Sequence, residues 1–157
     1  MPDKNKNVNR LVSQNKKAFF DYFILETYQA GIELCGTEVK SIRAGNCNLK
    51  DCYIQITGNE AYIENMHISP FEQGNIFNRD PLRRRRLLLH KWEINKLRGA
   101  VAKDGHTIVP LRIYFVRNLI KLDIAIARGK KLYDKRHEIA KKDQRRELEK
   151  EFKLRNI

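Results

Sequence analysis

Basic side chains gather in four short stretches of this sequence. They read NKKA at residues 15–18, EVKSIRAG at 38–45, RRRR at 83–86 and RGKKLYDKR at 128–136. Ammonium and guanidinium groups, accompanied by amide donors and glycine-containing turns, are the groups with which proteins hold phosphates. The chemistry that these residue types favour is therefore the binding of a polyanion.

The four consecutive arginines are expected in the first turns of a helix. The positive end of the helix dipole lies there and disfavours closely packed cations. Two interpretations remain open: a phosphate backbone compensates the repulsion, or the arginines form a solvated helix face.

The other reactive side chains form no catalytic or metal-binding pattern. No histidine stands at metal-ligand or catalytic-triad spacing, and the sequence lacks a glycine-rich phosphate loop and a nucleophile elbow. Cys35, Cys47 and Cys52 are separated by eleven and then four residues, which matches neither a disulfide framework nor a zinc site. We therefore expect a protein that is not an enzyme, holds no metal or cofactor, and keeps its cysteines reduced.

The net charge of +13 is concentrated at the two ends of the chain. Residues 1–17 carry a net charge of +4, residues 18–127 carry +3, and residues 128–157 carry +6. Basic arms around a nearly balanced body suit a nucleic acid, although frayed, solubilising ends would give the same count.

Nothing in the sequence indicates a membrane or an exported protein. No apolar run approaches the ~20 residues that a membrane-spanning helix needs. The first residues, MPDKNKNVNR, lack the apolar stretch of a secretory signal. We therefore expect a cytoplasmic protein with no membrane partner.

Residues 18–127 are expected to form a small, mainly β domain. AFFDYFILETY at residues 18–28 is rich in strand-forming residues, and GIELCGTEV at 31–39 offers a further pairing segment. CYIQI and AYIENMHI flank a turn, TGNE, and HTIVPLRIYFV and LIKLDIAIA flank the dipeptide RN, so two hairpins are predicted. Five or six short antiparallel strands indicate a closed or nearly closed barrel.

One helix is predicted to interrupt the strands, over residues 81–99. Asp80 is a suitable N-cap, Pro81 fits the first helical position, and Gly99 can end the element. An apolar stripe at helical spacing supports this prediction and consists of Leu87, His90, Ile94 and Leu97. The run Leu87–Leu89 is wider than the stripe needs, which indicates a bend or an exposed leucine.

The two ends are expected to be less ordered than the body. Residues 1–14 are predicted to form a flexible basic arm. Residues 128–157 have few apolar side chains, although acid-first pairs such as Glu138–Lys142 and Glu149–Lys153 favour a helix. The apolar content is too low to offset the entropy of ordering, so we predict a tail that is disordered when free and helical when bound.

Several stretches together resemble the SmpB family of SsrA-binding proteins of bacteria. They are NKKAFFDYFI, AGIELCGTEVKSIRAGNCNLKD, NMHISPFE, RRRLLLHKWEI and GKKLYDKR, in unbroken order from residue 15 to 136. The resemblance implies an antiparallel β-barrel of the OB type with flanking helices. It also implies a non-catalytic adaptor that binds tmRNA and, with it, rescues stalled ribosomes by trans-translation, in the place of the anticodon arm of a tRNA. Elongation factor Tu with GTP is implied as an indirect partner, through alanyl-tmRNA.

The resemblance also points to residues that contact the two RNA partners. Asn15, Leu88 and Gln29 match RNA-contacting positions of the family, the last of which is often Glu in relatives. Glu38, Lys40 and Arg43 belong to a signature segment whose direct contacts stay open. The complete set expected to bind tmRNA in residues 15–127 is Asn15, Lys16, Lys17, Gln29, Glu38, Lys40, Arg43, Leu88, His90 and Lys91.

The tail is implied to enter the vacant mRNA channel and to become helical against ribosomal RNA. The residues expected near the decoding centre are Gly129, Lys130, Lys131, Tyr133, Asp134, Lys135 and Arg136. Tyr133 could stack on a base, and the cations could contact phosphates. A structural ribosome-associated protein that binds rRNA is the alternative, because it would share a barrel with a basic extension.

Overall fold

An antiparallel β-sheet forms the body of the protein in the computed structural model, which describes residues 9–72, 78–103 and 105–156. Seven strands hydrogen-bond in the order β1-β8-β9-β2-β7-β5-β4, and a separate pair is made by β3 and β6. The elements in chain order are β1 (Asn9–Gln14), α1 (Lys16–Asp21), β2 (Tyr22–Ile32), α2 (Gly36–Arg43), β3 (Cys47–Asn48), β4 (Tyr53–Thr57), β5 (Glu60–Glu64), β6 (His67–Ile68), β7 (Arg85–Leu88), α3 (Lys91–Val101), β8 (His106–Val116), β9 (Leu119–Gly129) and α4 (Leu132–Arg155). The prediction of a mainly β, antiparallel fold with flanking helices is confirmed.

Both predicted hairpins are present. In the β8–β9 hairpin Val116 pairs with Leu119, and Arg117 in the turn has a φ of 57°. In the β4–β5 hairpin Thr57 pairs with Glu60, and Gly58 in the turn has a φ of 60°. Two-residue hairpin turns need this left-handed backbone, which glycine adopts without strain.

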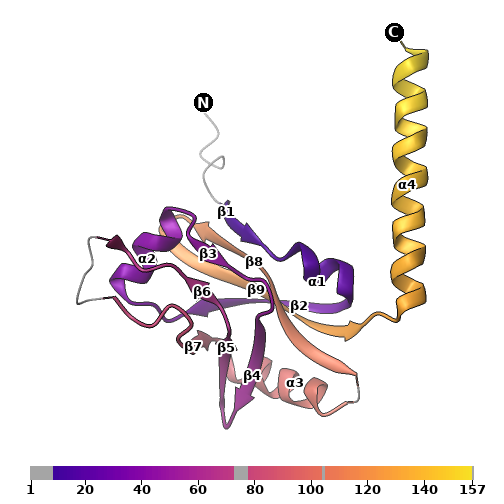
Figure 1. The fold of residues 1–157 in the computed structure, drawn as a ribbon. Helices are drawn as coiled ribbons and strands as arrows, with labels where there is room; N and C mark the ends of the chain where they lie inside the picture. The colour runs from indigo at the N-terminus through magenta and orange to yellow at the C-terminus, as the bar shows by residue number, and fades with distance from the viewer. Residues whose placement is uncertain (1–8, 73–77, 104, 157) are drawn as a thin grey trace, which may run out of the picture.

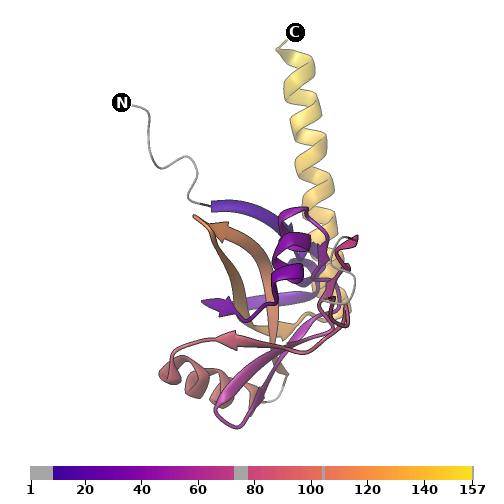
Figure 2. The ribbon, with the colours of Figure 1, turned by 90° about the vertical axis from the view of Figure 1, so that its left-hand side faces the viewer.

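The sheet curls around the larger of two hydrophobic clusters; the smaller one lies between α1, β8 and β9. Strand β4 at one edge lies against β8, which also pairs with the opposite edge strand, β1. The curl is visible when Figures 1 and 2 are compared. Helix α3 packs against β4, β8 and β9. Apolar side chains that alternate along the strands fill the interior, among them Ile54, Ile63, Ile108, Ile113, Leu122 and Ile124.

The N-terminal part of the fold differs from the prediction. Residues 9–14 form β1, which pairs with β8, although a flexible arm was expected over residues 1–14; residues 1–8 lie outside the described residues. The strand predicted over 18–28 is split, because α1 occupies residues 16–21 and β2 begins at Tyr22. A side-chain cap on α1 favours the helix locally: Oδ1 of Asn15 accepts from the backbone N–H of Ala18 at 3.2 Å.

The segment after β2 forms a helix where a pairing segment and a turn were predicted. Strand β2 ends at Ile32, and α2 spans Gly36–Arg43. The carboxylate of Glu38 accepts a hydrogen bond from the backbone N–H of Cys35 at 2.9 Å, which satisfies a free donor at the start of the helix.

The helix predicted over residues 81–99 is confirmed only in its second half, residues 91–99, and is wrong over residues 81–90. Residues 85–88 form β7, which pairs with β2 and β5, and α3 begins only at Lys91. Arg85 and Leu87 point inward along this strand, whereas Arg86 and Leu88 are exposed. Leu87 and His90, assigned to the helical stripe, thus lie in a strand and at the N-cap of α3.

A buried ion cluster holds β7 in place. Arg85 is completely buried, and its Nε lies 2.5 Å from Oε2 of Glu38, while Nη2 of Arg83 lies 2.5 Å from Oε1. The guanidinium of Arg85 also donates to the carbonyl oxygens of Met66 at 2.7 Å and Pro81 at 3.1 Å. Burial by itself would raise the pKa of Glu38, but the hydrogen bonds from Arg83, Cys35 and Arg85 outweigh it and lower the pKa. The cluster thus fastens α2 and the segment around Met66 to β7.

The last thirty residues also depart from the prediction. A disordered tail was expected in the free protein, but Leu132–Arg155 forms one helix, α4, without a buried residue. In both ribbon views α4 extends away from the sheet (Figures 1 and 2). Beyond its base its support is local: Asp134 accepts from the backbone N–H of Lys131 at 3.3 Å at the start of the helix, and acid-first pairs follow along it. None of the helices in the described part of the chain is both long enough and apolar enough to cross a membrane.

Replacement of Glu38 tests the ion cluster. Glu38→Gln leaves the charge of Arg85 buried without its partner, so the free energy of unfolding should fall by about 3 kcal/mol in urea titrations at neutral pH. Because the folded pKa of Glu38 is lowered, the difference from the native chain should be complete above the ordinary glutamate pKa. It should shrink as pH falls through the lowered folded pKa.

Glu64→Gln is the matched control for this experiment. Glu64 lies 2.7 Å from Arg84, but that arginine is largely exposed, so the loss should stay below about 1 kcal/mol. If both variants lost the same free energy of unfolding, the buried cluster would contribute no more to stability than an exposed ion pair.

Candidate nucleic-acid interface

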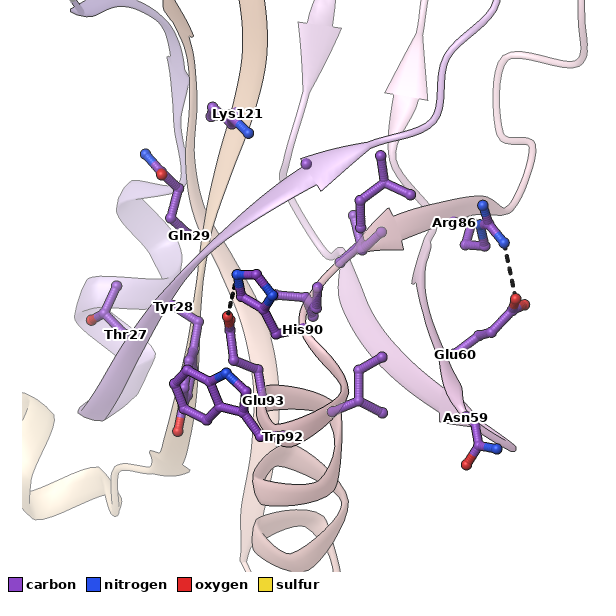
Figure 3. A pocket seen from close by; sticks show the side chains of 15 residues that line it. Thr27, Tyr28, Gln29, Asn59, Glu60, Arg86, His90, Trp92, Glu93 and Lys121 are labelled. Atoms are coloured by element: carbon purple, nitrogen blue, oxygen red, sulfur yellow. Dashed lines mark hydrogen bonds and ion pairs between the residues drawn. The ribbon is translucent and has the colours of Figure 1, made fainter.

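A groove of about 770 Å³ opens where β2, β7 and the start of α3 meet. Figure 3 shows Thr27 and Gln29 of β2 on one side, Arg86 of β7 with Glu60 on the other, and His90 and Trp92 between them. Lys121 of β9 stands above Gln29 in this view. The groove therefore combines aromatic and apolar surface with amide and ammonium groups.

Leu88 lies in this groove because of the glycine opposite it. Gly31 and Leu88 are direct partners in the β2–β7 pair. A Cβ on residue 31 would stand only 3.1 Å from the Cβ of Leu88, so a larger residue would displace the leucine. As it is, 51% of Leu88 is exposed. The over-wide leucine run of the sequence is thus explained by a strand that turns one leucine to the surface.

His90 and Trp92 give the groove an aromatic surface. Their rings are nearly parallel, at 7°, with centroids 6.3 Å apart. Trp92 is exposed, and Nζ of Lys96 lies 5.5 Å from the centroid of its ring. Exposed rings beside a cation are suited to stacking with unpaired bases.

His90 was expected to bind RNA, but for both His90 and Trp92 the sequence left open whether the side chain faces the core or the RNA, and Lys121 was not among the expected residues. The misplaced start of α3 left the direction of Trp92 undecided. With the helix beginning at Lys91, Trp92 is two residues before the buried Ile94, or ~200° around the helix, and so faces outward. Lys121 alternates with apolar residues along a predicted strand. This alternation predicts on which face of the sheet Lys121 lies, but not which residues of other strands lie beside it.

The side chain of Asn15 has a structural role in the fold. It is buried, its Nδ2 donates to the carbonyl oxygen of Pro110 at 3.0 Å, and its Oδ1 caps α1. Asn15 and Lys17 line a second hollow, of about 250 Å³, which shares no lining residue with the groove. Nζ of Lys17 lies 3.0 Å from Oδ1 of Asp51. Lys16 and Lys91 are exposed at the starts of α1 and α3.

The candidate residues of α2 do not reach the groove either. Glu38 is buried, and both of its carboxylate oxygens face arginines, so a ligand has no access to it. Lys40 places Nζ 5.4 Å from the centroid of the Phe71 ring. Arg43 is exposed, and its carbonyl oxygen accepts from Arg10 at 2.8 Å.

The four consecutive arginines are compensated within the protein. They pair as follows: Arg83 and Arg85 with Glu38, Arg84 with Glu64, and Arg86 with Glu33 and Glu60. Both interpretations of RRRR assumed a helix and were wrong about the element. The carboxylates that neutralise these arginines lie between 20 and 53 residues away in sequence, so local sequence could not reveal them.

Lys130 and Lys135 hold the base of α4 against α1, the first by a hydrogen bond and the second by an ion pair. Lys130 is nearly buried, with its side chain 4% exposed, and its Nζ lies 2.6 Å from Oε2 of Glu138 and 3.3 Å from the carbonyl oxygen of Phe19. Nζ of Lys135 lies 3.0 Å from Oδ1 of Asp21. Lys130, Asp134 and Lys135 thus support the tail in this structure.

The other candidate residues of the tail are more accessible. Gly129 is the last residue of β9, and Lys131, Tyr133 and Arg136 are exposed. Two cations and one aromatic ring are therefore available to a ligand at the start of α4.

The described residues contain no group of three or more His, Cys, Asp or Glu side chains that could hold a metal ion. The fold and its surface define a small antiparallel β-protein with an aromatic groove and a cationic helical extension.

The chain belongs to the SmpB protein family, whose model matches residues 12–154. An SsrA-binding protein of Lachnoclostridium phytofermentans is 59% identical over 148 residues, which are 94% of this chain and 96% of that protein. One from Caldanaerobacter subterraneus is 56% identical and covers 98% of both chains. A solved structure described as "tmRNA-SmpB: a journey to the center of the bacterial ribosome" contains a chain with a TM-score of 0.65 and 49% identity, covering 76% of this chain and 85% of that one.

Removal of the Asn15 side chain tests its role as a cap. Asn15→Ala should lower the free energy of unfolding by about 1–2 kcal/mol, because α1 loses its cap and the carbonyl of Pro110 loses a donor. Lys16→Ala, at the exposed neighbouring position, is the control and should change stability by less than about 0.5 kcal/mol. Native stability of Asn15→Ala in urea titrations would contradict this role.

Proposed function

We propose that this chain is a non-catalytic adaptor that binds tmRNA (SsrA) and, with it, rescues stalled ribosomes by trans-translation. The observation that carries the proposal is membership of the SmpB family, with 59% identity to an SsrA-binding protein over 94% of the chain. A structural role in the ribosome is not favoured, because the relatives reported above are SsrA-binding proteins.

The groove is the proposed binding surface for the tRNA-like domain of tmRNA. Leu88, His90 and Trp92 offer apolar and aromatic surface for unstacked bases, and Lys121 and Lys91 offer ammonium groups for phosphates. Lys16 and Lys17 supply further phosphate contacts beside the second hollow. Asn15 acts through the capped helix that carries these two lysines.

The tail is proposed to act on the ribosome. A helix with no buried residue and a net positive charge can fit along rRNA where mRNA is missing from its channel. Lys131, Tyr133 and Arg136 are the exposed groups proposed to meet the decoding centre. Elongation factor Tu with GTP is the proposed carrier of the alanyl-tmRNA complex, and the cytoplasm is the proposed location.

Competition binding tests the proposal directly. The full chain should bind the tRNA-like domain of tmRNA in preference to an unstructured RNA of equal length at physiological salt. Binding to both should weaken as salt rises, because phosphate contacts release counterions. Equal affinity for the two RNAs would overturn the proposal.

Leu88→Ala should separate RNA binding from stability. About half of the side chain is exposed, so the free energy of unfolding should change by less than about 0.5 kcal/mol. The affinity for the tRNA-like domain should fall about five- to tenfold, because apolar contact in the groove is lost. Leu25→Ala is the control: Leu25 is 50% exposed, against 51% for Leu88, but lies outside the groove. Equal losses of affinity for the two variants would exclude the groove as the binding surface.

Removal of α4 should abolish rescue and spare RNA capture. The chain should be cut after Lys131, because β9 continues to Gly129 and Lys130 packs onto α1. At physiological salt the affinity for tmRNA should be nearly unchanged, while tagging of stalled peptides in a reconstituted translation system should be lost. Tyr133→Ala in the full chain keeps the charge and should impair tagging more than binding. A cut that weakens capture as strongly as tagging would contradict the proposed division.

A further inference from the structure

Polar side chains form an ordered row across three strands at one side of the groove. Gln29 of β2 is the direct partner of Asp123 of β9, which in turn is the partner of Arg112 of β8. In the next row, Lys121 is the partner of both Gly31 and Tyr114. Paired residues share a face of the sheet and alternate residues repeat it, so these side chains lie together.

The hydrogen bonds in this row have one consistent direction. Arg112 and Asp123 form an ion pair, in which Nε of Arg112 lies 3.2 Å from Oδ2 of Asp123. An ionised carboxylate only accepts, so the hydroxyl of Tyr114 donates its proton to Oδ1 of Asp123, at 2.7 Å. The phenol oxygen is then an acceptor toward Gln29, whose Nε2 lies 2.6 Å away. Burial, reinforced by Asp123, raises the pKa of Tyr114, so the phenol keeps its proton at neutral pH.

This direction fixes the orientation of the Gln29 amide. Its NH₂ group must face Tyr114, because a carbonyl oxygen there would meet an oxygen that has already donated its proton. Tyr114 is buried, whereas Gln29 is exposed and lines the groove. The carbonyl oxygen and the second N–H of Gln29 are thus left for a ligand, side by side.

We propose that Tyr114 is a positioning residue that holds Gln29 so that its amide reads an RNA base edge with a donor beside an acceptor. The inference rests on the proposed function, since it takes RNA as the ligand of the groove. A phosphate offers acceptors only and would leave the carbonyl oxygen of Gln29 unpaired, whereas an adenine edge pairs with both groups of an amide. Lys121, in the neighbouring row, supplies the phosphate contact.

The row also accounts for an amide, and not a carboxylate, at residue 29. A carboxylate at residue 29 would stand directly opposite Asp123 in the sheet, and like charges in that position repel. The two carboxylates would compete for the single proton of Tyr114. Gln29→Glu should therefore weaken RNA binding in this chain.

A double-mutant cycle on the full chain tests whether Tyr114 acts through Gln29. The affinity for the tRNA-like domain of tmRNA should fall about tenfold in Gln29→Ala and about fivefold in Tyr114→Phe. The double variant should bind no more weakly than Gln29→Ala, because the phenol has nothing left to position. Losses that multiply in the double variant would overturn the inference.

The amide can also be observed without RNA. In ¹⁵N-labelled protein, the side-chain NH₂ signals of Gln29 should be shifted and slow to exchange with solvent. In Tyr114→Phe they should move to the positions of free glutamine amides. Unchanged NH₂ signals in that variant would show that Tyr114 does not hold the amide.

Two controls keep the outcomes distinct. Tyr62→Phe removes another tyrosine hydroxyl that contacts a carboxylate, that of Glu60, but Tyr62 does not line the groove. Its RNA affinity should equal that of the native chain, and a fivefold loss would make the effect of Tyr114→Phe non-specific. If the native chain itself shows no preference for the tRNA-like domain, the proposed function fails. A native preference that Tyr114→Phe leaves intact refutes the inference alone.

Discussion

One buried carboxylate, that of Glu38, determines how the RRRRLLL segment is arranged. It neutralises Arg85 in the core and Arg83 beside it, and an inward arginine is tolerated only with such a partner. With Arg85 inside, the alternation of a strand places Leu87 in the core and Leu88 at the surface. The leucine that lines the groove thus owes its position to an ion pair between α2 and β7, three residues away along the strand.

The register of β2, β9 and β8 supplies the polar side of the groove. It sets Gln29, Asp123 and Arg112 in one row and Gly31, Lys121 and Tyr114 in the next. Glycine at residue 31 leaves space that Leu88 occupies from β7. The apolar side chain of Leu88, the amide of Gln29 and the ammonium group of Lys121 are therefore brought together by backbone pairing among β7, β2 and β9.

The basic stretch at residues 83–86 and the basic start of α4 differ in whether carboxylates of the protein neutralise them. The arginines of residues 83–86 are held by carboxylates of the same protein, whereas Lys131 and Arg136 at the start of α4 are exposed. Helix α1 connects the β-sheet body to α4. Asn15 caps α1 at its start, and Asp21 at its end pairs with Lys135 of α4. The base of α4 is therefore held to the same sheet that carries the groove, while the rest of α4 depends on local interactions.

The sequence by itself determined the mainly β class, both hairpins, the cationic ends and the helical tendency of the tail. These features depend on alternation, turn residues and charge pairs within a few positions. It failed at residues 81–90, where Asp80 and Pro81 resemble the start of a helix, because nothing near Arg85 reveals that Glu38 will neutralise it in the core. It also left open whether Glu38 contacts RNA and whether Trp92 faces the core, and it did not predict the role of Tyr114. Only the tertiary structure could decide these points, because each depends on a partner distant in sequence, whose position is set by strand pairing and core packing.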